Sequence, residues 1–286
     1  MMPFAAKTHP GLRRSSNEDS YAAAPQLGLW VVADGLGGHS EGEIASAIAC
    51  DVIERDVGQG ASLTSAIEHA HREVLDEIQR RESDSNMGTT VVALRLDGSE
   101  YEIAWVGDSR AYLFDGQLRQ LTTDHSAVNE LLQSGAIAPE QAANHPQRHA
   151  LSRSLGVSGS NHSDASVTSG KLKQGQSILL CTDGVTDELS DTEILSALRM
   201  NRSLETQADA VMEAALGNGG HDNLTVVLVG EPPEGRQRSA LDLETTQNIG
   251  EPKMAMPARK GRSTKALLML LAVTIGAAIA GVWFTI

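Results

Sequence analysis

The sequence predicts an α+β fold in which the strands pair mainly antiparallel, and three observations support this prediction. Short apolar or alternating runs, typical of strands, outnumber the longer periodic runs typical of helices. Asp97-Gly98 and Asp115-Gly116 each separate two strand-like runs, as in a β-hairpin. The candidate helices come in consecutive pairs, which favours helical layers over sheet faces rather than a doubly wound parallel sheet.

The strand-like runs are spread over the first 230 residues. Each is short, rich in aliphatic, β-branched or aromatic residues, and bounded by glycine or polar residues. In chain order they are residues 27–33, 89–96, 101–106, 111–114, 176–181 and 224–229.

Four longer runs repeat apolar residues at helical spacing and therefore predict helices. They cover approximately residues 41–57, 62–82, 191–200 and 203–216. The first two follow one another directly, and so do the last two, so each pair can cover one sheet face.

The amino-acid composition of the chain changes near residue 231. Residues 231–265 combine prolines with many polar residues and no sustained apolar period, which predicts a flexible linker. Residues 266–286 carry no charge, and a helix of 21 residues is long enough to span a bilayer. We expect a single-pass transmembrane tail anchor there, because the alternative, a buried core helix, normally shows polar positions on one face. This division leaves residues 1–230 as the catalytic domain.

Basic residues directly before the apolar run predict its orientation. Positive charge stays on the cytoplasmic side of a membrane. We therefore expect the large N-terminal part to face the cytoplasm at the cytoplasmic membrane. The basic residues are Arg259, Lys260, Arg262 and Lys265.

The charge of the chain is strongly uneven. Residues 231–286 hold seven Lys or Arg and five Asp or Glu, which leaves 16 basic and 32 acidic residues in the first 230. Such an acidic domain repels nucleic acid and attracts divalent cations, although solubility alone is an alternative explanation. The two cysteines, Cys50 and Cys181, lie far apart and no secretion signal is recognisable, so we expect a reducing compartment.

Aspartates stand where apolar strands meet turns. Asp34, Asp108 and Asp183 each follow an apolar run and precede a small residue, whereas Asp222 comes just before a strand. Because the end of one antiparallel strand and the start of its neighbour share a sheet edge, all four carboxylates can converge on one rim. A single Asp-Gly pair usually marks only a turn. The repetition of the pattern indicates a shared site.

Converging carboxylates require a cation, because packing them together otherwise raises their pKa or lowers stability. Oxygen ligands suit Mg²⁺ or Mn²⁺, and no Cys/His cluster has zinc spacing. Two such ions can activate a water for attack at phosphorus, so no covalent nucleophile is needed. The sequence contains no Cys-x5-Arg loop, Walker lysine motif or G-x-S-x-G elbow. The glycines at 35–38 lack dinucleotide-binding spacing and more plausibly let the backbone approach a metal, including through the Gly35 carbonyl.

Seven motifs in order resemble those of the bacterial metal-dependent serine/threonine phosphatases of the protein phosphatase 2C type. The resemblance covers nearly all of residues 1–230. The motifs are GLRRSSNED (11–19), ADGLGGHSEGEIAS (33–46), GTT (88–90), VGDSRAYL (106–113), NHPQRHALSRSLG (144–156), LLCTDGVTDELSD (179–191) and GGHDNLTVVLV (219–229). The resemblance implies an antiparallel β-sandwich flanked by pairs of α-helices, in α-β-β-α layers, with a binuclear Mn²⁺ or Mg²⁺ site.

The resemblance also implies roles for the acids. Asp34 is expected to bridge two metals and Gly35 to bind one through its carbonyl, with Asp183 and Asp222 as the remaining core ligands. Asp108 matches the ligand of a third, weaker metal that it shares with Asp183. Glu18 is expected to act through a water, with Asp19 in support.

Basic residues near these acids receive roles in the same way. Arg14 matches the phosphate-binding arginine, with Arg13 as the adjacent rival and a solvated basic pair as the alternative. His39 is a candidate general acid for the leaving oxygen, or else a structural histidine.

Other residues near the motifs are expected to be structural. They are His125 and His221, and Cys181 is expected to lie in the core. Residues 126–163 match the variable flap of the family, which is the natural place for substrate selection.

These expectations combine into one hypothesis with alternatives. The chain is expected to hydrolyse phosphoserine and phosphothreonine in proteins by attack of a metal-bound water, with a bacterial serine/threonine kinase and its substrates as partners. A non-catalytic phosphoprotein-binding module on the same fold would lack a core acid, and none is missing. A stress-regulator or sporulation phosphatase with one dedicated partner is the other alternative.

Overall fold

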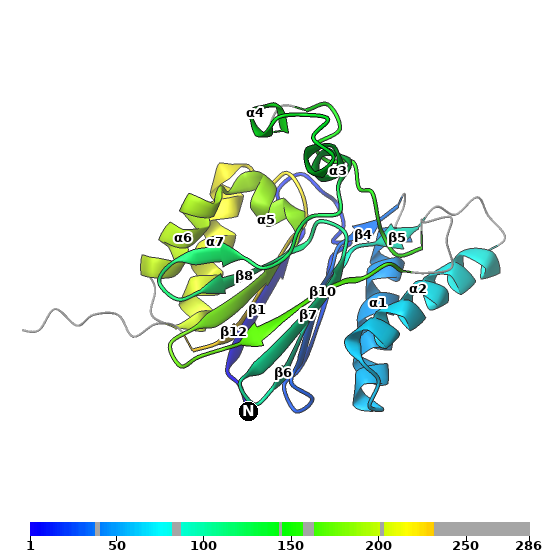
Figure 1. The fold of residues 1–286 in the computed structure, drawn as a ribbon, viewed down its shortest axis with the longest axis horizontal. Helices are drawn as coiled ribbons and strands as arrows, with labels where there is room; N and C mark the ends of the chain where they lie inside the picture. The colour runs from blue at the N-terminus through cyan, green and yellow to red at the C-terminus, as the bar shows by residue number, and fades with distance from the viewer. Residues whose placement is uncertain (38–40, 82–86, 143–144, 157–162, 201–202, 232–286) are drawn as a thin grey trace, which may run out of the picture. The chain divides into compact units, whose positions relative to one another are not determined.

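The protein's structure, a computed structural model, describes residues 1–37, 41–81, 87–142, 145–156, 163–200 and 203–231. All of them belong to one compact unit, residues 1–236. Two five-stranded antiparallel sheets face one another in this unit, and helices cover both outer faces (Figure 1). The expected α+β fold with antiparallel sheets is therefore confirmed.

The first sheet joins strands from both ends of the domain. Every neighbouring pair in it is antiparallel. Its order is β1 (Phe4–His9), β12 (Leu224–Gly230), β11 (Ser177–Cys181), β8 (Arg110–Phe114) and β9 (Leu118–Gln120).

The second sheet is built mainly from the middle of the chain and is also antiparallel throughout. Its order is β10 (Ser166–Lys171), β7 (Glu100–Val106), β6 (Val91–Asp97), β3 (Leu29–Ala33) and β2 (Ser20–Ala24). A two-stranded ladder, β4 (Gly35–Leu36) with β5 (Gly88–Thr89), extends from it.

The helices follow the expected pairing. α1 (Glu41–Gly58) and α2 (Leu63–Arg80) cover the second sheet, while α6 (Asp191–Met200) and α7 (Leu204–Asn218) cover the first. Three shorter helices lie at one end of the sandwich (Figure 1). They are α5 (Asp183–Glu188), α3 (Ala127–Gln133) and α4 (Pro139–Ala142).

Three apolar layers hold the sandwich together. In β3 all five residues are buried, because Leu29, Val31 and Ala33 face the helices while Trp30 and Val32 face the other sheet. A strand covered on both faces is apolar at every position, which explains why this run was recognisable as a strand.

The predicted strands and helices are confirmed to within a few residues, and both Asp-Gly hairpins form. β1, β2, β4, β9 and β10 were not predicted, and neither were the short helices α3, α4 and α5. β1, β2 and β10 are edge strands whose small or polar residues hide the alternation, and β9 has only three residues. None of the described helices combines the length and low polarity that crossing a bilayer requires. The predicted tail anchor, residues 266–286, and the linker from residue 232 lie outside the described residues.

Candidate metal centre

The four motif aspartates meet at the end of the sandwich that also carries α3 and α5. Asp34 follows β3, Asp108 lies between β7 and β8, Asp183 begins α5 directly after β11, and Asp222 precedes β12. β11 and β12 are antiparallel neighbours, so the end of one adjoins the beginning of the other. The expected convergence on one rim is therefore found, with Asp183 in a helical turn rather than in a simple turn.

Asp34 and Asp183 are in direct contact across the two sheets. Their carboxyl groups lie close enough for each to affect the pKa of the other. Burial raises the pKa of both carboxyls, and for Asp34 the nearby charge of Asp183 raises it further. The Asp34 N–H donates to Thr90 Oγ1 at 3.1 Å, and the Thr90 N–H donates to the Asp34 carbonyl at 2.9 Å. Two hydrogen bonds to one threonine thus fix the backbone that carries Asp34.

Asp108 lies near both Asp34 and Asp183. Burial holds the pKa of Asp108 well above its usual range, and the charge of Asp183 adds to this effect. The next residue, Ser109, is buried and hydrogen-bonded to Thr90 through its Oγ at 2.7 Å. Thr90 therefore contacts the loops of both Asp34 and Asp108, so these acids cannot move independently.

Asp222 contacts the arginine that was predicted to bind phosphate. Arg14 Nη2 donates to Asp222 Oδ2 at 2.7 Å. This hydrogen bond raises the pKa of Arg14, and the charges of Glu18 and Asp34 contribute in the same direction. The guanidinium thus faces three of the acids. Its side chain is 56% exposed, so it can also contact a group arriving from solvent. Arg13 is exposed as well.

Asn223 holds the loop that carries Arg14, residues 10–19 and called the arginine loop below, against the strand that follows Asp222. Its Nδ2 donates to the carbonyls of Pro10 and Ser16, both at 2.9 Å, and its Oδ1 accepts from the Glu18 N–H at 2.7 Å. One buried amide therefore sets the position of both Arg14 and Glu18. Asn223 belongs to the motif GGHDNLTVVLV, but no role was predicted for it.

Glu18 and the Gly35 carbonyl border the same small space. A Cβ placed on Gly42 would lie 2.6 Å from Glu18 Oε2 and 2.8 Å from the Gly35 oxygen. Gly35 itself is enclosed, because a Cβ there would run into the carbonyls of Gly42 and Glu18. Only glycines allow this approach of two backbone segments and one carboxylate.

Asp19 lies buried behind these groups. Its Oδ2 accepts from Thr182 Oγ1 at 2.9 Å and from Thr225 Oγ1 at 2.7 Å, whereas Oδ1 is buried without a hydrogen-bond partner. Burial raises the pKa of Asp19 to about 7. A buried carboxylate oxygen that lacks a hydrogen-bond partner is well suited to interact with a cation or with a water bound to it.

The chemistry of these groups fits a hard cation. All candidate ligands are oxygens, and several carboxyls have raised pKa values because they are buried and lie near other carboxylates. Within the described ranges, no group of three or more His, Cys, Asp or Glu side chains is arranged to bind a metal ion by itself. The backbone carbonyl of Gly35 and water-mediated contact by Glu18 would therefore be needed to complete a coordination shell.

The remaining predicted residues fall into two groups. His39 lies outside the described residues. His125 stacks on Trp105, accepts from the Gly107 N–H at 3.2 Å and contacts Ser166, and burial lowers its pKa to about 4. It is a neutral structural side chain, as expected.

His221 and Cys181 also take structural positions. His221 Nδ1 lies 2.6 Å from Glu188 Oε1 on the surface. Cys181 is fully buried in the core between the first sheet and its helices, and burial raises the pKa of its thiol to about 12. Such a thiol is inert at neutral pH, which agrees with the expected core position.

The segment expected to form a flap, residues 126–163, contributes α3 and α4 above the site (Figure 1). His149 Nδ1 lies 3.3 Å from Asp187 Oδ2, on the helix that Asp183 begins. Burial raises the pKa of Asp183, and the nearby His149 partly opposes this rise. This flap contact was not predicted, since nothing in the local sequence pairs residue 149 with residue 187.

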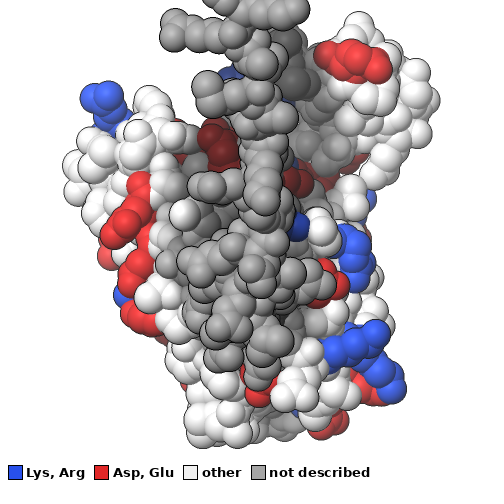
Figure 2. Space-filling model, turned by 90° about the vertical axis from the view of Figure 1, so that its left-hand side faces the viewer, with Lys and Arg blue, Asp and Glu red and all other residues white. Residues whose placement is uncertain are grey.

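Acidic side chains are spread over the visible part of the face in Figure 2, while basic ones gather mainly toward its lower right. This distribution agrees with the predicted acidic domain.

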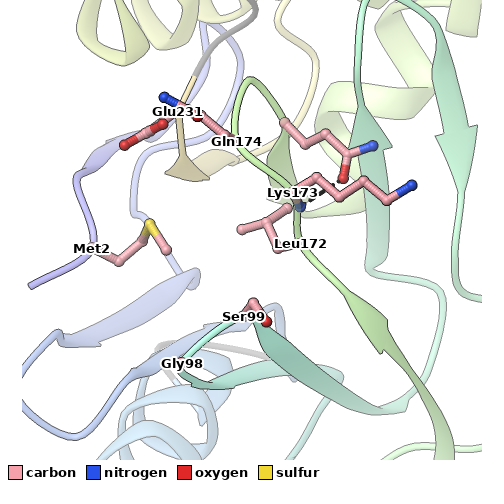
Figure 3. Close-up of a pocket in the computed structure, with 8 residues that line it drawn as sticks. Met2, Gly98, Ser99, Leu172, Lys173, Gln174 and Glu231 are labelled. Carbon is pink, nitrogen blue, oxygen red and sulfur yellow. Dashed lines mark hydrogen bonds between the residues drawn. The ribbon is translucent and has the colours of Figure 1, made fainter.

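A separate cavity of about 310 Å³ opens at the opposite end of the sandwich (Figure 3). It is lined by Met2, Leu172 and Lys173 among others, and it shares no residue with the candidate centre.

Comparisons with known proteins agree with this geometry. The sequence profile described as Protein phosphatase 2C matches residues 13–219. A serine/threonine phosphatase stp from Listeria welshimeri is 39% identical over 237 residues, covering 78% of this chain and 93% of that protein. The crystal structure of the Mycobacterium tuberculosis serine/threonine phosphatase PstP/Ppp superposes with a TM-score of 0.72 at 34% identity, covering 82% and 99% of the two chains.

A further solved structure contains metal. It is the catalytic domain of the serine/threonine protein phosphatase PstP in complex with two manganese ions. This chain matches it with a TM-score of 0.70 at 32% identity, covering 81% of this chain and 98% of that one.

Proposed function

The chain belongs to the protein phosphatase 2C family and is a metal-dependent serine/threonine phosphatase, and from this premise we propose how its own residues carry out the reaction. The observation that carries the proposal is the meeting of Asp34, Asp183 and Asp222 with Arg14 at one end of the sandwich. Two Mn²⁺ or Mg²⁺ ions at this centre would supply an activated water and offset negative charge at phosphorus.

The acids and the glycine hold the cations in this proposal. Asp34 would be a ligand of both core ions, and Asp183, Asp222 and the Gly35 carbonyl would complete the core. Glu18 would act through a water, and Asp108 would hold a third ion together with Asp183. The proximity of the Asp34 and Asp183 carboxyl groups supports this division.

Arg14 binds the phosphoryl group of the substrate. A guanidinium offers paired N–H donors that match two phosphate oxygens. Its half-exposed position, with the contact to Asp222 on one side and solvent on the other, lets it orient a phosphate beside the cations.

The central test measures Mn²⁺-dependent hydrolysis of a phosphothreonine peptide and of p-nitrophenyl phosphate. Asp34→Asn is expected to lower kcat/KM by at least about 1000-fold for both substrates, because the bridging charge is lost. Asp51→Asn, an exposed aspartate of α1, is the matched control and should retain activity. Full activity in Asp34→Asn with an unchanged circular dichroism spectrum would contradict the assignment.

His39 is proposed as the general acid for the leaving oxygen, an assignment that rests on the sequence alone. Nitrophenolate leaves without protonation, whereas a threonine alkoxide requires a proton. His39→Gln should therefore lower kcat much more for the phosphothreonine peptide than for p-nitrophenyl phosphate. Equal losses on both substrates would argue against this role.

Membrane attachment through residues 266–286 is proposed from their uncharged composition and the preceding basic residues. The full chain should sediment with membranes and resist carbonate extraction, while a chain ending at residue 265 should not. A protease added to intact cells should leave the phosphatase domain intact if it faces the cytoplasm.

The proposed partners are phosphorylated proteins and a bacterial serine/threonine kinase that phosphorylates them. The support is the enzyme class together with an acidic domain that disfavours nucleic acid. Cells that express Asp34→Asn in place of the native chain should accumulate phosphoserine and phosphothreonine on a defined set of proteins. An unchanged phosphoproteome would count against the proposal.

A further inference from the structure

A large apolar side chain stands exposed beside the proposed phosphate-binding arginine. Leu12 is 61% exposed and precedes Arg14 by two residues in the loop between β1 and β2. Within the described residues the other exposed large apolar side chains are Met1, Phe4, Tyr21, Val167 and Met200. Leu12 is the one that shares a loop with Arg14.

The backbone of this loop is fixed at several points. The Leu12 N–H donates to the Gly220 carbonyl at 2.7 Å, and the loop is held on both sides of Leu12 by Asn223, through Pro10 and Ser16. Gly11 has a positive φ of 79°, and a side chain there would run into the carbonyl of Asp222. The exposure of Leu12 is therefore imposed by a rigid backbone rather than by a loose loop.

The Leu12 side chain packs against Gly220, in the segment that leads to the proposed metal ligand Asp222. A Cβ placed on Gly220 would lie 3.2 Å from Leu12 Cγ, so the leucine packs closely over this glycine. Gly220 lies two residues before Asp222, which Arg14 contacts. Leu12 is thus an exposed apolar side chain beside the segment that leads to Asp222.

We propose that Leu12 is a specificity-determining residue, which contacts an apolar side chain one or two positions from the phosphorylated residue of a protein substrate. The inference rests on the proposed function, because Arg14 must hold the phosphate for the neighbouring side chain to reach Leu12. An extended peptide advances about 3.3 Å per residue, so the proposal places a side chain one or two positions from the phosphorylated residue over Leu12, which shares the loop of Arg14. Contact would remove apolar surface of both partners from water.

The test compares three substrates with the full-length chain in Mn²⁺. Two phosphothreonine peptides have the same sequence except that both positions on each side of the phosphothreonine are leucine in one and alanine in the other. The third substrate, p-nitrophenyl phosphate, has no flanking residue.

Leu12→Ala is expected to lower the ratio of kcat/KM for the leucine peptide to that for p-nitrophenyl phosphate by about three- to tenfold, mainly through KM. The ratio for the alanine peptide should change less than twofold. Leu12→Met, which keeps an apolar side chain of similar volume, should restore most of the preference. Met200→Ala, which removes an exposed apolar side chain from the end of α6, is the matched control and should leave all three ratios unchanged.

Two results would overturn the proposal. An equal loss on all three substrates would make Leu12 a structural support of the arginine loop. An unchanged preference for the leucine peptide would exclude the contact. Failure of the proposed function is distinguishable from both, because it would appear as absence of Mn²⁺-dependent hydrolysis by the unmodified chain.

Discussion

Replacing Asn223 with alanine tests whether one buried amide holds the arginine loop in place. Asn223 is 6% exposed, and its side chain makes three hydrogen bonds, to the carbonyls of Pro10 and Ser16 and to the N–H of Glu18. Each such hydrogen bond contributes about 1 kcal/mol net to the free energy of unfolding. Backbone groups that lose their partner and cannot reach water lower the stability further. We expect Asn223→Ala to lower the free energy of unfolding by about 3 kcal/mol, or the melting temperature by about 6–12 °C.

The same substitution should lower activity, because Arg14 and Glu18 both lose their anchor. A displacement of about 1 Å can reduce the rate about 100-fold, so a loss of this order in kcat/KM is expected. Urea unfolding followed by circular dichroism and p-nitrophenyl phosphate hydrolysis in Mn²⁺ measure the two effects. Asn218→Ala removes an exposed bond to the Glu188 carbonyl and serves as the control. If Asn223→Ala unfolded at the same urea concentration as the unmodified chain and kept its kcat/KM, the anchoring argument would be wrong.

Two further predictions concern the glycines and the buried acid. Gly35→Ala should destabilise the fold by about 1–3 kcal/mol and weaken Mn²⁺ binding in calorimetry, because the new methyl collides with two carbonyls. Gly217→Ala places a methyl group in open space on α7, so it should leave the stability of the fold unchanged or raise it. Equal losses of stability in the two variants would contradict the steric argument for Gly35. In EDTA, stability from protonated Asp19 is complete below its unfolded pKa near 3.8 and is lost as pH rises through about 7, so the melting temperature should fall between pH 5 and 8. Mn²⁺ should stabilise more at pH 8 than at pH 5, and a pH-independent melting curve in EDTA would refute the argument.

The strands that are easiest to predict from the sequence are those that are fully buried. β3, β11 and β12 are buried at every position, and each appears in the sequence as a largely apolar run. β1 and β10 are edge strands with mixed polar residues, so their pairing depends on partners more than 60 residues away in the chain. Local pattern cannot show such pairing.

Some residues of the candidate centre could be predicted from the sequence and others could not. The aspartates were recognisable because each adjoins a strand, and antiparallel pairing brings strand ends together. Asn223 and the contact between His149 and Asp187 were not predicted, because their partners lie far away in sequence and no periodicity links them. Leu12 was likewise unremarkable in sequence, since its exposure depends on the loop that Asn223 holds.

The pairing of the first strand with the last explains why the arginine loop meets the metal ligands. β1 and β12 align His9 opposite Leu224, so Pro10 necessarily comes beside Asn223 and Asp222. Arg14 therefore reaches Asp222 only when residues at both ends of the domain have paired, which requires closing most of the chain into one loop. Because such long-range pairing costs the most conformational entropy, the complete centre should be among the last features to form during folding. The proposed metal and phosphate subsites would then exist only in the fully assembled sandwich, so a partly folded chain would lack phosphatase activity.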